Sequence, residues 1–119
     1  MLCIDINSTS DYILVTLGGI LDGGETELAS QKITQALIHE DDEETVKTNL
    51  IIDLSNLDYI SSGGLGILLI FHRKVGKAGY LMIICNPSPM AAKLLTTTGM
   101  YGVFQIQPSV DSAIKTLST

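Results

Sequence analysis

Short apolar runs alternate with segments of helical periodicity along this chain. The runs at 2–6, 12–17, 50–54, 80–84 and 103–106 are rich in apolar and β-branched residues and predict β-strands. Apolar residues recur every three or four positions at 25–39, from 62 to the glycines at 76 and 79, at 90–95 and from 108 onward, which predicts helices. This order of elements indicates an α/β sandwich with a mixed sheet of about five strands and about four helices, forming a single domain over residues 1–119.

Two stretches of the pattern carry more detail. The polar turn at 7–11 joins the first two strands as a hairpin, and Gly18 and Gly19 are expected to end the second strand. The run at 50–54 is typical of a strand buried on both faces of a parallel sheet, and a short loop then leads to the next helix. That helix is very apolar at 65–71. Either it lies wholly beneath the sheet, or part of its surface near its start is exposed to a partner.

Composition narrows the class of protein. With 45% hydrophobic and 17% charged residues, the 119-residue chain is expected to fold around one core. It has 13 acidic and 7 basic side chains and a formal net charge of -6. Nucleic acid is therefore an unfavourable partner, since binding phosphates requires clustered Lys and Arg, and a basic protein partner is favoured.

The cysteines and the hydropathy bear on location. Cys3 and Cys85 belong to predicted strands with no Cys-x-x-Cys spacing, so two buried reduced thiols are favoured over a disulfide or a metal site. Asp5 interrupts any apolar core of a signal peptide, and no apolar run reaches the ~18 residues that span a bilayer. We expect a cytoplasmic protein, monomeric and without a cofactor.

The remaining polar residues suggest little chemistry. Five consecutive carboxylates at 40–44 lack the alternating ligands and central Gly of a calcium loop, so a solvated loop is favoured over a metal site. His39 and His72 have no spacing typical of metal binding or acid–base catalysis, and we expect them at the surface or at helix edges.

The Ser-Ser-Gly-Gly segment at 61–64 stands where a strand passes into a helix. Ser61 and Ser62 both offer hydroxyl groups for an N-cap. The first turn of a helix also carries unpaired N–H groups and about half a positive charge, which favours a phosphate there. Taken alone, the pair is better explained as an ordinary N-cap, with glycines that permit a close turn. The spacing of the glycines does not match a P-loop, a dinucleotide fingerprint or a nucleophile elbow.

The segment LDYISSGGLG at 57–66 resembles the phosphorylation segment of bacterial anti-sigma factor antagonists in the STAS domain family. The resemblance extends over nearly the whole chain. It places the phosphate acceptor on Ser62, the family's usual Asp on Ser61 and the next small residue on Gly63. It also implies that Ser61, Ser62, Gly63, Gly64 and Leu65 face a partner. Ser61 removes one negative charge beside the acceptor, and Gly63 is expected to loosen the first helical turn.

The segment Gly-Ile-Leu-Asp at 19–22 resembles a second family signature, a Gly-Glu-Leu-Asp-like loop that helps form the partner-facing surface. Asp22 matches the acidic position, and Ile20 replaces the common Glu. Asp22 also fits a helix N-cap or turn before Glu25, and both roles are compatible. Gly23 and Gly24 predict a mobile loop.

The resemblance implies a binding module that is not an enzyme. Unphosphorylated at Ser62, it would bind an anti-sigma Ser/Thr kinase and release that kinase's sigma factor or regulator. Phosphorylation of Ser62 would end binding, and a Ser/Thr phosphatase would restore it. One alternative is a STAS scaffold subunit of a transport or regulatory complex that is not phosphorylated, which Gly63 and the missing Asp favour. A third hypothesis, an enzyme with a Ser nucleophile, is weakest because neither His can be placed beside Ser62.

Overall fold

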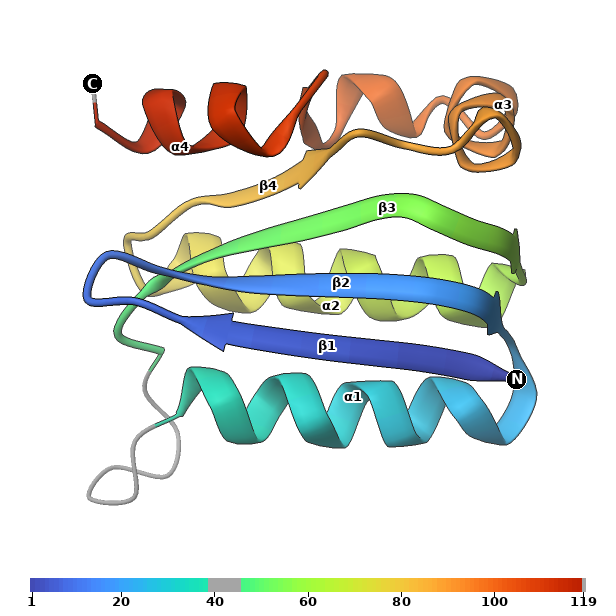
Figure 1. Ribbon diagram of the computed structural model, residues 1–119, viewed down its shortest axis with the longest axis horizontal. Coiled ribbons are helices and arrows are strands. Elements are labelled where there is room, and N and C mark those ends of the chain that lie inside the picture. Colours follow the sequence, from blue (N-terminus) through green and yellow to red (C-terminus); the bar gives the residue numbers. More distant parts are fainter. Residues whose placement is uncertain (39–45, 119) are drawn as a thin grey trace.

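The computed structural model describes residues 1–38 and 46–118. Within them lies a five-stranded sheet in the order β1-β2-β3-β4-β5, in which β1 runs antiparallel to β2 and the other pairs are parallel (Figure 1). The predicted fold class is confirmed. The strands are β1 (Leu2–Ser8), β2 (Tyr12–Leu21), β3 (Asn49–Ile60), β4 (Met82–Cys85) and β5 (Gln105–Gln107). The helices are α1 (Gly23–Leu37), α2 (Ser62–Lys77), α3 (Pro89–Thr97) and α4 (Val110–Leu117), with a 3-10 turn η1 (Met100–Gly102).

Alternation along the strands creates two apolar layers. Leu50 and Ile52 of β3 belong to the main core, which also contains buried residues of α1 and α2. Ile51 points the opposite way and packs with Ile83, Cys85 and Ala113 in a smaller cluster beneath α4. Since successive strand residues face opposite sides, the continuous apolar run of β3 serves both layers. In Figure 1, α4 lies on the opposite side of the strands from α1. The buried Ala91 and Leu95 of α3 belong to the main core.

β2 and β3 are both longer than predicted. Gly18 and Gly19 do not end β2, which continues to Leu21 with register shifts on either side of the glycine pair. Gly19 has φ +81°, and a Cβ there would overlap the Met1 carbonyl oxygen, so glycine is required by both conformation and space. The extension is stable because Leu21 pairs with Ile60 of β3 and both side chains are buried. The predicted loop after residue 54 is therefore strand.

Other elements differ by a few residues from the prediction. α1 covers Gly23–Leu37 rather than 25–39, and it buries Ala29, Ile33 and Leu37 as its spacing indicated. β4 and β5 each begin two residues later than predicted, and α4 begins at Val110, after Ser109 as its N-cap. His39 and the carboxylates at 40–44 lie outside the described residues.

The two cysteines differ, and the prediction that both are buried is wrong. Cys3 is exposed and Cys85 is buried. β1 is an edge strand whose Leu2, Ile4 and Ile6 pack on the core, so the residues between them, Cys3 and Asp5, face outward. Burial, reinforced by the nearby Asp53, raises the pKa of the Cys85 thiol from 9.0 to about 12.

Candidate functional site

A single residue, Ser61, joins the end of β3 to the start of α2. Its N–H donates to the Leu21 carbonyl at 3.0 Å, and its own carbonyl accepts from the Leu65 N–H at 2.9 Å. The junction is therefore tied both to the end of β2 and to the first turn of α2. This short connection fixes where the following residue, Ser62, stands.

Ser61 is the N-cap of α2. Its Oγ accepts a hydrogen bond from the Gly64 N–H at 3.1 Å, and it also donates to the Leu21 carbonyl at 3.4 Å. A capping oxygen of this kind satisfies one of the N–H groups that a helix start leaves unpaired. The cap interpretation is thus confirmed for Ser61, and its hydroxyl is occupied by structural contacts.

The two glycines of the segment have different surroundings. A Cβ on Gly64 would lie 2.8 Å from both the Leu21 carbonyl oxygen and Ile60 Cγ1, so no larger residue fits without displacing backbone. A Cβ on Gly63 would meet only Ser61 Oγ, at 3.6 Å, which is an ordinary contact. Gly64 and Leu65 are both buried. Gly64 therefore allows the close approach of α2 to β2, whereas Gly63 meets no such constraint.

Ser62 is the first residue of α2 and is exposed. It stands at the positive end of the helix dipole, next to a neighbour that already supplies the cap. A hydroxyl in this position is accessible to a modifying enzyme, and a phosphate attached to it would be favoured by the helix end. The geometry that the sequence-based hypothesis requires of the acceptor is present.

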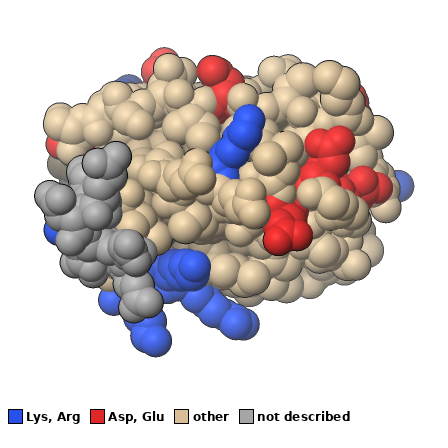
Figure 2. Space-filling model, turned by 90° about the horizontal axis from the view of Figure 1, so that it is seen from below, with Lys and Arg blue, Asp and Glu red and all other residues tan. Residues whose placement is uncertain are grey.

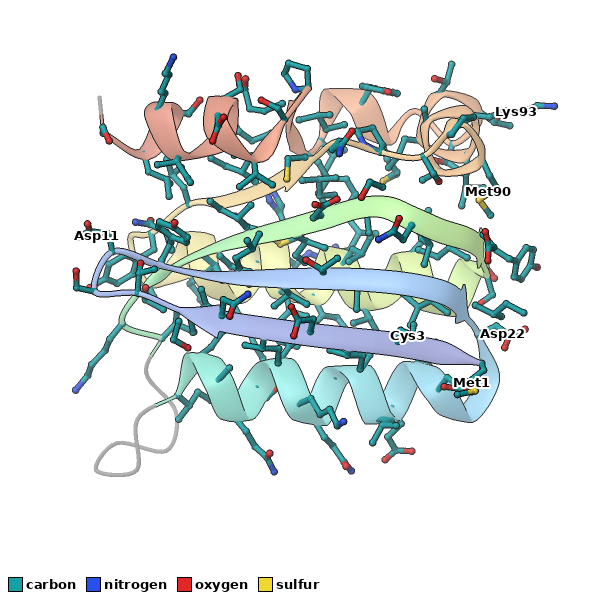
Figure 3. The ribbon with its side chains drawn as sticks, in the orientation of Figure 1. Met1, Cys3, Asp11, Asp22, Met90 and Lys93 are labelled. Atoms are coloured by element: carbon teal, nitrogen blue, oxygen red, sulfur yellow. The ribbon has the colours of Figure 1, made fainter. Side chains whose placement is uncertain are left out.

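Asp22 lies on the adjacent connection, between β2 and α1. It occupies the N-cap position of α1, where its carbonyl accepts from the Glu25 N–H at 3.1 Å, but its side chain makes no capping hydrogen bond. The neighbouring Leu21 carbonyl receives the bonds from Ser61, so the two connections lie side by side. Figure 3 shows Asp22 at the same end of the molecule as Met1. The carboxylate of Asp22 is thus half-buried, close to the Ser61 junction and not used as a cap.

Two exposed apolar residues at this end were not predicted as site residues. Ile20 on β2 and Tyr59 on β3 are direct register partners, and their side chains are 38% and 48% exposed. Sequence reasoning placed Ile20 in a loop and ended the strand before Tyr59, so the pairing was missed. No local pattern gave this pairing, because a register shift between Gly19 and Ile20 interrupts the alternation of side chains.

Acidic side chains gather at this end of the molecule. In Figure 2 they concentrate toward the right, where α1 begins in Figure 1, whereas most of the basic ones lie toward the left. Asp22, Glu25 and Asp58 belong to the residues next to the two connections. Arg73, Lys74 and Lys77 lie near the far end of α2. The end of the molecule that carries Ser62 thus has several acidic residues, although Figure 3 shows Lys93 at this end and Asp11 at the other.

His72 lies far from Ser62. It is ten residues along α2, about 15 Å at 1.5 Å per residue. Its ring packs edge-on against Phe104, with the ring centroids 5.5 Å apart. His72 is therefore not placed to act as a base for Ser62.

No helix in the described part of the chain is long and apolar enough to cross a membrane.

Comparisons with known proteins agree with this architecture. The STAS domain model matches residues 4–113. The anti-sigma F factor antagonist of Paenibacillus polymyxa is 26% identical over 115 residues, covering 97% of this chain and 92% of that protein. SpoIIAA, solved in unphosphorylated and phosphorylated forms, is 23% identical, with TM-scores of 0.79 and 0.73. The alignments cover 98% and 97% of this chain and 96% and 99% of those chains.

A similar fold occurs inside a much larger protein. The murine anion transporter Slc26a9 matches with a TM-score of 0.76 and 16% identity, over 94% of this chain but 18% of that one. The mixed sheet with its antiparallel edge strand is the fold that this chain shares with these proteins. The chain belongs to the STAS domain family, as its sequence motifs indicated.

Proposed function

We propose that this protein is an anti-sigma factor antagonist-like binding module controlled by phosphorylation of Ser62. With Ser62 unmodified, it binds a Ser/Thr kinase of the anti-sigma type in the cytoplasm, and the kinase releases its sigma factor or regulator. The kinase then phosphorylates Ser62, which ends binding, and a Ser/Thr phosphatase resets the protein. The module itself performs no catalysis. The observation that carries the proposal is the exposed Ser62 hydroxyl at the start of α2.

The related proteins support this function. The Paenibacillus polymyxa relative is named as an antagonist of an anti-sigma factor and aligns along almost the entire chain. SpoIIAA, which shares the fold, has been solved both with and without phosphorylation. A role transferred at this level of identity is a proposal, and the arrangement around Ser62 gives it a physical basis.

The change of Asp to Ser at position 61 is compatible with the proposal. Asp and Ser are both strong N-cap residues, because either offers an oxygen to the helix N–H groups. Ser61 accepts the bond from Gly64 that a capping carboxylate would accept. Ser61 in place of Asp therefore removes a negative charge but keeps the N-cap hydrogen bond of α2.

Phosphorylation of Ser62 is expected to act on the surface that faces the partner. A phosphate on Ser62 adds about -1.5 to -2 charges and three acceptor oxygens. The start of α2 favours such a group, so the helix itself is expected to stay folded. The phosphate nevertheless stands at the end of the molecule that carries Asp22 and Asp58, and it occupies space that a partner would fill. Loss of binding therefore follows from the bulk of the phosphate in the contact surface.

The test compares the affinities of two forms of the protein for purified anti-sigma-type kinases that the same genome encodes. One form is unmodified, and the other carries phosphoserine introduced at position 62 during synthesis. Titration calorimetry without ATP should give an affinity at least tenfold lower for the phosphorylated form, equivalent to about 1.4 kcal/mol. Ser62→Ala should bind like the unmodified protein, since it adds neither charge nor bulk.

Two results would overturn the proposal. Equal affinity of both forms would indicate the alternative, a STAS scaffold that phosphorylation does not control. Absence of binding by either form to all such kinases would remove the antagonist role.

A further inference from the structure

The exposed pair Ile20 and Tyr59 owes its position to an irregularity in the sheet. Along β2 and β3, Gly19 pairs with Leu57 and Ile20 pairs with Tyr59, so Asp58 is an extra residue on β3. Such a bulge reverses the alternation of side chains beyond it. Leu57 is buried, Asp58 and Tyr59 are both exposed, and Ile60 is buried again. The bulge therefore turns Tyr59 outward beside Ile20.

The pair lies where β2 and β3 lead to Asp22 and to Ser61. Leu21 and Ile60, the next partners along the two strands, are 0% and 4% exposed. Ile20 and Tyr59 must therefore both point to the opposite, outer side. Ser61 follows Ile60 directly and is bonded to Leu21. Ile20 stands two residues before Asp22 and Tyr59 three residues before Ser62, so the pair lies at the same end of the sheet as the start of α2.

This pair differs from the other exposed apolar residues. Leu28 and Ile70 lie on different helices and Leu81 precedes β4, while the exposed Tyr101 and Val103 belong to η1 and its C-cap and are not strand partners. Ile20 and Tyr59 are direct strand partners on the extension of β2 and β3 beyond their pairing with β1 and β4, and have the acidic Asp22 and Asp58 beside them in the chain. Aromatic residues in such settings often contribute much of the energy of an interface.

We propose that Ile20 and Tyr59 are the apolar anchor by which the kinase recognises this protein. The facing surface of the kinase is an apolar recess bordered by Lys or Arg side chains, which complement Asp22 and Asp58. Ile20 stands where the resembling family signature commonly has Glu, so recognition here uses apolar contact at a position where charge is usual. The proposal rests on the proposed function and adds the residues that determine which kinase is bound.

The test measures the affinity of variants for the purified kinase that phosphorylates Ser62, without ATP. Tyr59→Ala should weaken binding at least tenfold, and Ile20→Ala about fivefold. Ile20→Glu should weaken it more than Ile20→Ala, because it places a charge in an apolar recess. Tyr59→Phe should bind with an affinity within twofold of the wild type. This variant separates the contribution of the aromatic ring from that of its hydroxyl group.

Leu81→Ala is the matched control. Leu81 is 42% exposed, close to the 38% of Ile20. Its carbonyl accepts from the Leu50 N–H at the beginning of β3, so it lies at the other end of that strand. We expect wild-type affinity for this variant. Unfolding in urea verifies that all variants fold, and since the side chains are exposed, their midpoints should be close to that of the wild type.

The outcomes separate the two proposals. If the Ile20 and Tyr59 variants bind as tightly as Leu81→Ala while phosphorylation of Ser62 still abolishes binding, the anchor is refuted and the switch remains. If Ile20→Glu binds more tightly than the wild type, the surface recognises a charged partner and the anchor is also refuted. If no kinase either binds the protein or phosphorylates Ser62, both proposals fall.

Discussion

The segment Ser61–Gly64 contains two pairs of identical residue types in opposite roles. The inner pair, Ser61 and Gly64, faces β2: one residue caps α2, and the other permits the close approach to the Leu21 carbonyl. The outer pair, Ser62 and Gly63, is exposed. The same two amino acids therefore build the helix start in one case and are accessible on it in the other. Position relative to the Leu21 carbonyl, rather than residue type, makes this distinction.

The glycines should show the largest difference. Gly64→Ala is expected to lower the free energy of unfolding by about 2–3 kcal/mol, because its Cβ would press on a backbone oxygen and on Ile60. Gly63→Ala should raise it by up to about 1 kcal/mol, since alanine is the better helix former and the added Cβ makes only an ordinary contact. Urea unfolding followed by circular dichroism measures both. Equal effects of the two substitutions would mean that α2 does not approach β2 as described.

Substitutions of the serines should change the free energy of unfolding over a smaller range than those of the glycines. Ser88, the N-cap of α3, is buried, donates to the Leu57 carbonyl at 2.7 Å and accepts from the Ala91 N–H at 3.2 Å. Ser88→Ala should cost about 2 kcal/mol of unfolding free energy, and Ser61→Ala about 1 kcal/mol. Ser62→Ala should change it by less than about 0.5 kcal/mol. The same unfolding assay tests this order, and a larger cost for Ser62→Ala than for Ser61→Ala would contradict the assignment of the cap.

The cysteines repeat the contrast between inner and outer positions on the sheet. A thiol reagent should modify Cys3 in the folded protein and leave Cys85 unmodified until the protein unfolds. Because the pKa of Cys85 is about 12 when folded, against its ordinary value of 9.0, the unfolded thiol ionises first as pH rises. Its contribution to stability is complete below pH 9 and is lost between about pH 9 and 12.

The Cys85→Ala variant isolates this effect. Over the same alkaline range it should lose less stability than the wild type, since it has no thiol to ionise. Mass spectrometry of the labelled protein and alkaline urea unfolding are the measurements. Rapid labelling of Cys85 in the native state would show that its burial is incomplete.

Much of the fold could be predicted from the sequence, because each main element has its own local signal. The order of strands and helices followed from apolar periodicity, and Ser88 with Pro89 marked the start of α3. The ends of β2 and β3 could not be predicted. Gly18 and Gly19 locally favour a turn, and only the pairing of Leu21 with Ile60 makes strand the better conformation. Which strand lies at the edge is likewise a property of topology, and this explains the wrong prediction for Cys3.

The candidate site was predictable in part for the same reason. Two adjacent serines before a helix indicate an N-cap, but the sequence does not say which of them takes it. The choice depends on the Leu21 carbonyl, which comes from forty residues earlier in the chain. The outward turn of Tyr59 depends on a bulge that no local pattern announces. The predicted partner-facing roles of Asp22, Gly63, Gly64 and Leu65 stay predictions. Burial of Gly64 and Leu65 suits them better to shaping the surface than to touching a partner. The prediction of a loop at Gly23 and Gly24 is wrong, because both belong to the first turn of α1. Their predicted mobility is still to be measured.

The central claim is that Ser62 receives the phosphate while the adjacent Ser61 remains a structural cap. The most direct measurement is site-resolved mass spectrometry of the wild-type protein, Ser61→Ala and Ser62→Ala after incubation with ATP and each anti-sigma-type kinase of the same genome. We predict one phosphate per wild-type chain, located on Ser62, retained in Ser61→Ala and absent from Ser62→Ala. Phosphate on Ser61, or incorporation that persists in Ser62→Ala, would contradict the account.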